Sequence, residues 1–401
     1  MITRMYDTAI LTALGFYPVL ALLGARQTGK TTLLRQLLPD YSYVTLDLPS
    51  EAALAEQDPE LFFARHPAPV VIDEVQYAPG LFRHIKSMVD RDRHRMGQFV
   101  LTGSQKFSLM KELSDSLAGR VHIIGLEGLS HAELSAIGTG GIGNYLYRGG
   151  FPELWRVPDL PAAGFFSSYM ATYLERDVRQ ILNVGSLRDF ERFVRVLATR
   201  HAQQLDLTAI ANAVGITART AKSWVSVLEA SNQIELLEPW HGNVGKRIVK
   251  TPKLYFSDSG LVCWLLGIGP DGLSASPFVG AVWEGVVFAE MRRHTQARGL
   301  NRSFWYYRDN VGMELDFLVL GEGARFIECK WTAQPDASAA KAIRKLAELA
   351  TESANAELAT ARGAIVCRTP NRYPLADAGV PIWVCALSDI GTIMESLDQP
   401  D

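Results

Sequence analysis

The 401-residue sequence is poor in cysteine and histidine, and neither residue type is spaced as in a redox motif or a zinc site. The four cysteines show no C-x-x-C spacing and lie in apolar stretches, which predicts reduced core thiols in a cytoplasmic protein. They are Cys263, Cys329, Cys367 and Cys385. The eight histidines include no H-x-x-x-H pair, so we do not expect structural zinc.

Long apolar runs and a strong excess of one charge are also missing. No stretch approaches the length of a membrane span, and Arg4 and Asp7 interrupt the N-terminus, so we expect neither a signal peptide nor contact with a membrane. The formal net charge of −3 gives no overall attraction to nucleic acid and confines any DNA binding to a local basic patch. A chain of this length, 48% hydrophobic, is expected to form two or three domains.

What the sequence does contain is a glycine-rich loop directly after an apolar segment. Residues 19–23 run into G-x-x-x-x-G-K-T, the pattern of a phosphate-binding loop between a strand and a helix. Its glycines let backbone N–H groups face the β- and γ-phosphates, Lys30 adds a movable positive charge, and Thr31 offers a hydroxyl to Mg²⁺. The predicted nucleotide-binding residues are Gly24, Ala25, Arg26, Gln27, Thr28, Gly29, Lys30, Thr31 and Thr32. The alternative, a glycine turn that binds nothing, is disfavoured by the complete pattern.

A second segment fits the same ligand. Residues 69–74 form a short apolar run that ends in two carboxylates, Asp73 and Glu74. Asp73 would hold Mg²⁺ through water, and Glu74 would polarise the water that attacks the γ-phosphate. Two solvated acids at a strand end would be the simpler interpretation if the pair stood alone.

Short apolar segments alternate with helical ones from residue 20 to about residue 127, which predicts a parallel α/β sheet. The expected strands cover residues 20–23, 43–47, 70–73, 99–102 and 121–126. Ligands bind at the carboxyl ends of such strands, so Thr102 or Ser104 could sense the γ-phosphate, although a Ser/Gly turn is an alternative. Arg120 precedes the last strand, where it could point at a neighbouring subunit's nucleotide or lie on the surface.

Residues 130–199 are expected to be helical, with a loop at 147–153 at a domain boundary. Residues 205–228 then have the spacing of a helix-turn-helix, in which Gly215 ends the first helix and Thr217 caps the second. Segments 233–240 and 246–249 would form a hairpin, or wing. DNA contact through this module is one interpretation, and a lid or protein contact is the other. The DNA-binding candidates are Arg219, Lys222, Lys246 and Arg247.

The C-terminal region combines an apolar helix around residues 283–284 with expected strands at 303–308, 313–320 and 324–330. Glu284, Asp316 and Glu328 could ligate Mg²⁺, and Lys330, two residues beyond the last acid, could orient a water. This geometry suits a metal-dependent nuclease. The alternative is a strand whose polar residues lie on its solvated side, but an unpaired carboxylate within the apolar segment around Asp316 would be costly to bury.

With these residues identified, the chain resembles the prokaryotic AAA-family ATPases that carry a C-terminal domain of unknown function, DUF4143. The motifs are G-x-R-Q-x-G-K-T-T at 24–32, V-I-D-E-V-Q at 71–76, L-T-G-S at 101–104, L-A-G-R at 117–120 and G-G-F-P-E at 149–153. The resemblance implies an AAA+ core over residues 1–130, a helical lid over 131–200, a winged helix over 201–256 and a restriction-endonuclease-like domain over 257–401. It also implies an arginine finger at Arg120. The nuclease-like motif lacks the usual Pro-Asp dipeptide.

We therefore expect an α/β P-loop protein that uses ATP and Mg²⁺, hydrolyses ATP, acts on DNA, and could assemble as a homo-oligomer. Cutting of DNA by the C-terminal domain is left open. The alternatives are an ATP-dependent signalling switch and a DNA-binding regulator, in which the C-terminal domain only binds a partner.

Overall fold

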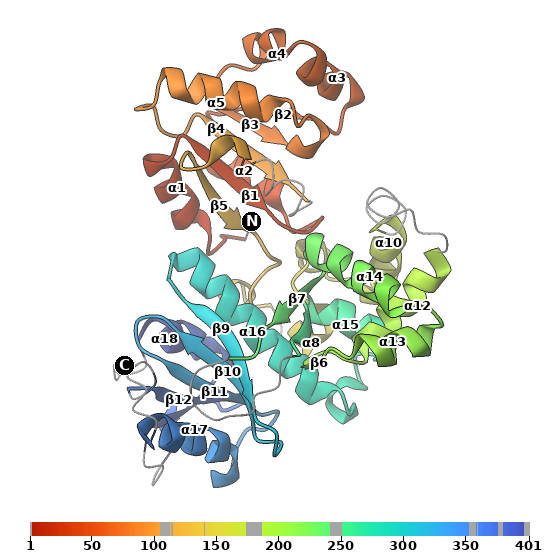
Figure 1. Ribbon diagram of the computed structural model, residues 1–401, viewed down its shortest axis with the longest axis vertical. Coiled ribbons are helices and arrows are strands. Elements are labelled where there is room, and N and C mark those ends of the chain that lie inside the picture. Colours follow the sequence, from red (N-terminus) through yellow and green to blue (C-terminus); the bar gives the residue numbers. More distant parts are fainter. Residues whose placement is uncertain are drawn as a thin grey trace.

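The computed structural model describes residues 2–104, 113, 115–139, 141–173, 187–240, 251–352, 358, 360–375 and 380–396. Three sheets organise this part of the chain. The N-terminal sheet lies at one end of the molecule, while the helical middle region and the C-terminal sheet lie beside each other at the other end (Figure 1). None of the described helices has the length and apolarity needed to cross a membrane.

The N-terminal sheet has five parallel strands in the order β2-β3-β4-β1-β5. They are β1 (Val19–Leu23), β2 (Ser42–Thr45), β3 (Val70–Asp73), β4 (Phe99–Gly103) and β5 (Val121–Gly125). Every residue of β1, β3 and β4 is buried, because these inner strands are covered on both faces. The predicted α/β class is confirmed, and each strand begins and ends within two residues of its predicted position.

Helices cover both faces of this sheet and create two hydrophobic cores. One core includes Phe62 and Phe82, and the other includes Tyr6, Ile10 and Leu34. The helices are α1 (Asp7–Phe16), α2 (Lys30–Leu37), α3 (Pro49–Gln57), α4 (Pro59–Arg65), the 3-10 helix η1 (Val75–Tyr77) and α5 (Leu81–Arg91). Because the strands are parallel, the carboxyl ends of β1, β3 and β4 lie at the same edge of the sheet.

The middle region is mainly helical. Its helices are α7 (His131–Ala136), α8 (Ile142–Arg148), α9 (Pro152–Arg156), α10 (Ala162–Tyr173), α12 (Leu187–Ala198), α13 (Leu207–Val214), α14 (Ala218–Ala230) and α15 (Ser259–Leu265). Helix α13 ends at Gly215, which has a φ of 86°, and the Thr217 hydroxyl caps α14 by accepting the N–H of Thr220. The two helices of the predicted helix-turn-helix are therefore present.

A small antiparallel sheet follows α14, with the order β6-β8-β7. Its strands are β6 (Gln203–Gln204), β7 (Ile234–Leu237) and β8 (Lys253–Phe256). The partner of β7 is β8, which lies beyond the predicted hairpin segment 246–249. All four residues of β8 are buried, so this strand lies in the core. The second arm of the predicted wing, at 246–249, lies outside the described residues.

The C-terminal region forms a mixed six-stranded sheet in the order β13-β14-β12-β11-β10-β9. Its strands are β9 (Ser303–Arg308), β10 (Glu314–Leu320), β11 (Arg325–Cys329), β12 (Arg362–Val366), β13 (Tyr373–Pro374) and β14 (Ile382–Cys385). Its helices are α16 (Val279–Arg298), α17 (Lys341–Glu352) and α18 (Ile390–Glu395), with 3-10 turns η3 (Leu273–Ala275), η4 (Ala337–Ala340) and η5 (Leu387–Asp389).

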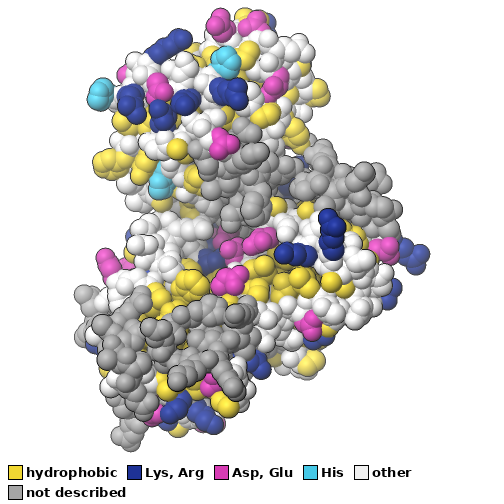
Figure 2. Space-filling model, viewed as in Figure 1, with side chains coloured by type: hydrophobic (Ala, Val, Ile, Leu, Met, Phe, Trp, Pro, Cys, Tyr) yellow, Lys and Arg dark blue, Asp and Glu magenta, His cyan; other side chains and the backbone are white. Residues whose placement is uncertain are grey.

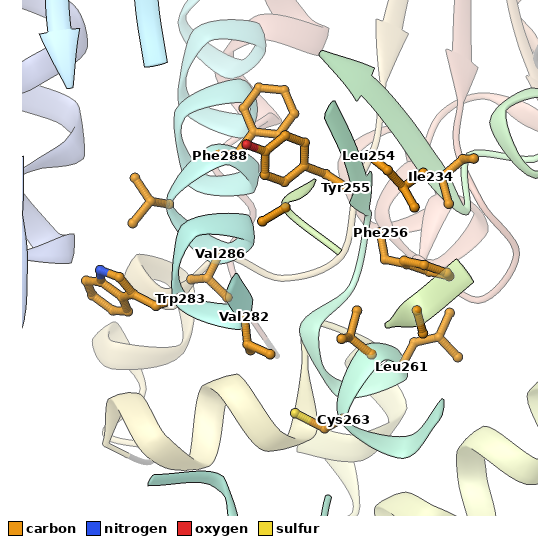
Figure 3. Packing of buried hydrophobic residues seen from close by; sticks show 14 of the residues in the cluster. Ile234, Leu254, Tyr255, Phe256, Leu261, Cys263, Val282, Trp283, Val286 and Phe288 are labelled. Carbon is orange, nitrogen blue, oxygen red and sulfur yellow. The ribbon is translucent and has the colours of Figure 1, made fainter. Parts of the chain in front are cut away.

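One hydrophobic core joins the middle and C-terminal regions. Figure 3 shows side chains of α16, among them Val286 and Phe288, facing residues of β8 and α15. The rings of Phe288 and Tyr255 lie 4.8 Å apart, and Phe288 stacks on Phe317 of β10 at 5.4 Å. Because α16 shares this core with both regions, it is the element that joins them.

Candidate functional site

The glycine-rich loop joins the end of β1 to the start of α2, as the sequence predicts. The backbone of Gly24 lies so close to its neighbour that a Cβ on this residue would be 2.1 Å from the carbonyl oxygen of Leu126. Gly29 is the N-cap of α2 and has a φ of 90°, a conformation that favours glycine. Both glycines are therefore required by the path of the loop.

Lys30 begins α2, and its side chain folds back into the curl of the loop. The residue is only 6% exposed, and Nζ donates hydrogen bonds to the carbonyls of Gly24 and Ala25, each at 2.9 Å. The ammonium group is therefore held among the backbone atoms that surround phosphates in loops of this kind.

Asp73, the last residue of β3, accepts hydrogen bonds from three hydroxyl groups. The Thr31 Oγ1 donates to Oδ2 of Asp73 at 2.9 Å, which links the first turn of α2 to the acidic strand end. The Tyr43 hydroxyl also donates to Oδ2, and the Thr102 hydroxyl donates to Oδ1. Burial, followed by the hydrogen bond to Asp73, raises the pKa of Tyr43 to about 12, so this phenol stays a donor.

Glu74 has a φ of 56°, which is uncommon for a residue other than glycine. This left-handed conformation turns the chain at the end of β3, and Glu74 lines the large cavity described below. Its Oε2 accepts hydrogen bonds from Ser104 Oγ, at 3.2 Å, and from the Gln76 amide. The carboxylate is therefore oriented by two neighbouring side chains.

Thr102 and Ser104, the two candidates for sensing the γ-phosphate, both contact the acids at the end of β3. Thr102 is completely buried, and its hydroxyl donates to Asp73 while accepting the N–H of Glu74 at 3.2 Å. Ser104 contacts the Glu74 carboxylate. Both hydroxyls thus position the two acids, a role that the sequence pattern alone did not distinguish from phosphate contact.

A cavity of about 1220 Å³ lies between the loop and the middle region. Residues 26–27 and 29–33 line one side, together with Glu74, and residues of α9 and α10 line the other. The second side includes Trp155 and Arg156, which the sequence analysis did not single out. The G-G-F-P-E motif just before them was the available signal, since it marks the turn into α9. The cavity is larger than the 300–1,000 Å³ typical of small-molecule sites, so a nucleotide fits within it.

Arg4 is another residue whose role at the site the sequence analysis missed. It is buried, and its guanidinium donates to the carbonyls of Thr28, Glu127 and Gly128 and forms a 3.0 Å ion pair with Glu133. Arg4 therefore fastens the phosphate-binding loop to the segment that leads from β5 into α7.

Arg120 lies at the opposite edge of the sheet from the loop. Its carbonyl accepts the N–H of Val19, the first residue of β1, whereas the loop follows the last residue of that strand. Five strand residues span about 16 Å, so Arg120 is remote from the site of its own chain. Its guanidinium forms a two-pronged ion pair with Asp90, at 2.7 and 3.0 Å.

The DNA-binding candidates are described only in part. Arg219 and Lys222 are exposed and lie three residues apart on α14, which puts them on one face of that helix. Lys246 and Arg247 lie outside the described residues.

The three C-terminal carboxylates proposed as metal ligands lie on neighbouring elements. Glu284 lies on α16, Asp316 on β10 and Glu328 on the neighbouring β11. Burial, followed by the charge of Asp316, raises the pKa values of both Glu284 and Glu328. Lys330 forms a 2.7 Å ion pair with Glu328.

Lys253 of β8, which the sequence analysis did not consider, reaches into this group of acids. Its Nζ lies 2.5 Å from Glu314, 3.0 Å from Glu284 and 3.8 Å from Asp316. Burial by itself lowers the pKa of this lysine, but the surrounding carboxylates outweigh that effect and hold it above the ordinary value.

The geometry therefore differs from the expected magnesium site. Among the residues that the structure describes, no three Asp, Glu, His or Cys side chains converge so that they could hold a metal ion. The physical reason is that Glu284 and Asp316 face an ammonium group, while Glu328 is paired with Lys330. The contact between Lys253 and these acids joins segments far apart in the sequence, so no local motif predicts it.

A buried ionic network connects α16 to the other two regions. Arg292 lies 2.5 Å from Glu127, just after β5, and 2.8 Å from Glu235 of β7. The adjacent Arg293 pairs with Glu290 at 2.7 Å. The C-terminal region is thus linked by charge both to the sheet that carries the loop and to the helix-turn-helix module.

Comparisons with known proteins agree with this three-part organisation. Three family models match: an AAA domain at residues 17–135, the domain of unknown function DUF8612 at 140–272, and the domain of unknown function DUF4143 at 279–387. Uncharacterized proteins of Mycobacterium tuberculosis and Mycobacterium bovis are each 31% identical over 384 residues, which cover 95% of this chain and 83% of theirs.

Solved structures are similar at low identity. A Walker-type ATPase of Pyrococcus abyssi is 14% identical and aligns with 66% of this chain and 96% of its own, with a TM-score of 0.45. RuvB of Thermotoga maritima is 17% identical and aligns with 58% of this chain and 89% of its own, with a TM-score of 0.30. On the sequence matches, this chain belongs to the family of AAA-domain proteins that carry a C-terminal DUF4143 domain.

Proposed function

We propose that this protein hydrolyses ATP at the phosphate-binding loop and uses the reaction to act on DNA. The observation that carries the first part is the hydrogen bond between Thr31 and Asp73, because it joins the end of the loop to the acidic strand end. The AAA-domain match over the same residues supports it.

The residues of the loop fit a nucleoside triphosphate with its metal. Thr31 and Asp73 would hold Mg²⁺, which supplies positive charge to the phosphate oxygens. Lys30 contributes a second cation, since it can exchange the carbonyls of Gly24 and Ala25 for phosphate oxygens. The two loop glycines keep the backbone N–H groups directed at the same point.

Glu74 is the residue we assign to activation of the attacking water. Its carboxylate lines the cavity and is oriented by Ser104 and Gln76, so it can accept a proton or polarise a water beside the γ-phosphate. Thr102 is a positioning residue, because its hydroxyl holds the Asp73 carboxylate and the backbone of Glu74.

The wall formed by the middle region suits the base and the sugar. Trp155 of α9 provides apolar surface in the cavity, together with Ile2 near the N-terminus and Leu129 just before α7, and Arg156 adds a cation beside Trp155. Arg156 is exposed and paired with Glu153 at 2.5 Å. A nucleotide in the cavity would therefore contact both the phosphate-binding loop and α9. The predicted bounds place these two elements in different domains, so bound ATP would bridge the ATPase core and the helical lid.

The DNA part of the proposal rests on the helix-turn-helix geometry of α13 and α14. Arg219 and Lys222 on α14 can reach phosphates. Figure 2 shows a separate gathering of Lys and Arg side chains on the N-terminal domain, over α5, where Arg83, Arg91 and Arg93 are exposed. DNA binding would use one of these local patches, because the whole chain is slightly acidic.

Lys253 favours a second candidate for the C-terminal domain. Because its ammonium group occupies the carboxylate cluster, the domain fits a partner-binding or coupling role better than cleavage of DNA. The protein would then be an ATP-dependent switch, with α16 connecting the ATPase region to the C-terminal sheet.

ATP turnover measured with no DNA and with single-stranded, double-stranded and branched DNA tests this function. We expect Mg²⁺-dependent phosphate release that changes several-fold with at least one DNA form and is absent in Lys30→Ala. A turnover rate that no form of DNA changes would favour the ATP-dependent switch. No turnover under any condition would contradict the ATPase proposal.

A further inference from the structure

We infer that the ammonium group of Lys253 is the resident cation of the C-terminal carboxylate cluster, and that it keeps this cluster closed to divalent metal. The cluster consists of Glu284, Glu314, Asp316 and Glu328. Three of these residues are the metal ligands proposed for the nuclease-like site, so the inference bears on whether that site can bind the metal that DNA cleavage would need.

The distances favour an ammonium ion over Mg²⁺ or Mn²⁺. Lys253 Nζ is 3.0 Å from Glu284 and 2.5 Å from Glu314, which are hydrogen-bonding separations. Magnesium requires oxygens at about 2.0–2.1 Å in near-octahedral geometry. A metal at the centre of these carboxylates would have to displace Nζ.

Lys253 cannot leave easily, because its backbone is fixed on both sides. In β8 it pairs with Gln204 of β6 and with Leu237 of β7. Its side chain is 2% exposed and lies against the ring of Tyr306, with Nζ 5.5 Å from the ring centre. Lys253 is therefore held in the cluster by the fold, whereas an exposed lysine could form or break such contacts freely.

Each carboxylate of the cluster has at least one oxygen that accepts from a donor of the protein. Glu284 Oε1 accepts the hydroxyl of Tyr255 at 2.6 Å in addition to Lys253, and Asp316 Oδ2 accepts the N–H of Cys329 at 2.8 Å. Glu328 Oε1 accepts from Lys330, while its buried Oε2 has no hydrogen-bond partner among the described residues. A metal ion that used the bonded oxygens would have to compete with these donors.

The charge of the cluster is nearly balanced without metal. When all four carboxyl groups are ionised, they are matched by three cations, namely Lys253, Lys330 and Arg308, which pairs with Glu314 at 2.7 Å. A divalent ion added to this set would turn one excess negative charge into one excess positive charge. Removal of Lys253 would instead leave two excess negative charges, which one divalent ion would neutralise.

Direct measurement of Mn²⁺ binding tests the inference independently of ATP turnover. The full chain, without nucleotide, is titrated with Mn²⁺ while the electron paramagnetic resonance signal of the free ion is recorded. All proteins carry Thr31→Ala, which removes a hydroxyl from the loop site and lowers its contribution. The set is this background protein alone and with Asp316→Asn, Lys253→Met, Lys253→Arg, or Lys253→Met plus Asp316→Asn.

We expect the background protein to bind no Mn²⁺ that depends on Asp316. Lys253→Met, which keeps the length but removes the charge, should gain one Mn²⁺ per chain, and Asp316→Asn should abolish that gain. Lys253→Arg, which keeps the charge, should gain none. Melting curves establish that each variant is folded.

Two results would overturn the inference. One is Mn²⁺ binding by the background protein that disappears with Asp316→Asn, since metal would then coexist with Lys253. The other is a folded Lys253→Met variant that gains no Mn²⁺. If Lys253→Met does not fold, the comparison of the background protein with its Asp316→Asn variant decides alone.

Discussion

Arg4 and Glu133 form a buried ion pair, with Nε of Arg4 3.0 Å from Oε1 of Glu133. The pair joins the residues before α1 to the first turn of α7, and the same guanidinium holds the carbonyl of Thr28 in the phosphate-binding loop. The loop and the start of the middle region are therefore connected by one side chain.

Replacing Arg4 with Met should destabilise the protein, because a buried carboxylate would lose its cationic partner. We expect the free energy of unfolding, measured by urea denaturation, to fall by an amount on the order of 3 kcal/mol. Lys345→Met is the matched control, since its pair with Glu348 is exposed and should contribute less than about 1 kcal/mol. Equal urea midpoints for the two variants would contradict the structural role of Arg4.

Gly285 on α16 has no space for a side chain. A Cβ there would lie 2.2 Å from Nε2 of His201, which is buried and held in place because its Nδ1 accepts the N–H of Phe256. Gly285→Ala should therefore lower the free energy of unfolding by about 1–3 kcal/mol. Gly280→Ala in the same helix meets no atom within 4 Å and should leave stability unchanged or slightly higher. The contact is refuted if both variants melt at the same temperature.

If Arg120 is the arginine finger that the family resemblance implies, it must act on a neighbouring subunit, because it lies at the far edge of its own sheet. Arg120→Ala should then keep nucleotide affinity and lose turnover. Mixing these subunits with Glu74→Gln subunits, which still carry Arg120, should restore activity. A protein that stays monomeric with ATP and DNA, yet hydrolyses at the full rate, would exclude this role.

The helix-turn-helix predicts a salt-dependent affinity for DNA. If Arg219 and Lys222 contact phosphates, each Ala substitution should reduce the slope of log K against log salt by about one unit. Arg83→Ala on α5 is the control for the other basic surface. A slope that changes only with Arg83→Ala would indicate that DNA contacts α5 instead. The lack of any gel shift at low salt would contradict DNA binding by the helix-turn-helix.

The strands of the ATPase region could be predicted closely because each is a short apolar run with a clear end. β3 covers 70–73 as expected, and Thr217 caps α14 where the sequence places it. These features depend on neighbouring residues, which the sequence displays directly.

Features that depend on distant contacts were not predictable. The hydrogen bond from Tyr43 to Asp73 and the approach of Lys253 to Glu314 each join residues far apart in the sequence, with no local pattern. The pairing of β7 with the buried strand β8 is another long-range contact that the sequence analysis did not identify.

The most direct test of the ATPase function compares ATP binding and phosphate release in the unmodified chain, Lys30→Ala and Glu74→Gln. The unmodified chain should release phosphate with Mg²⁺. Lys30→Ala should lose tight ATP binding, while Glu74→Gln should bind ATP and hydrolyse it at least about 10²-fold more slowly. Turnover that is the same in all three proteins would contradict the assignment of this site.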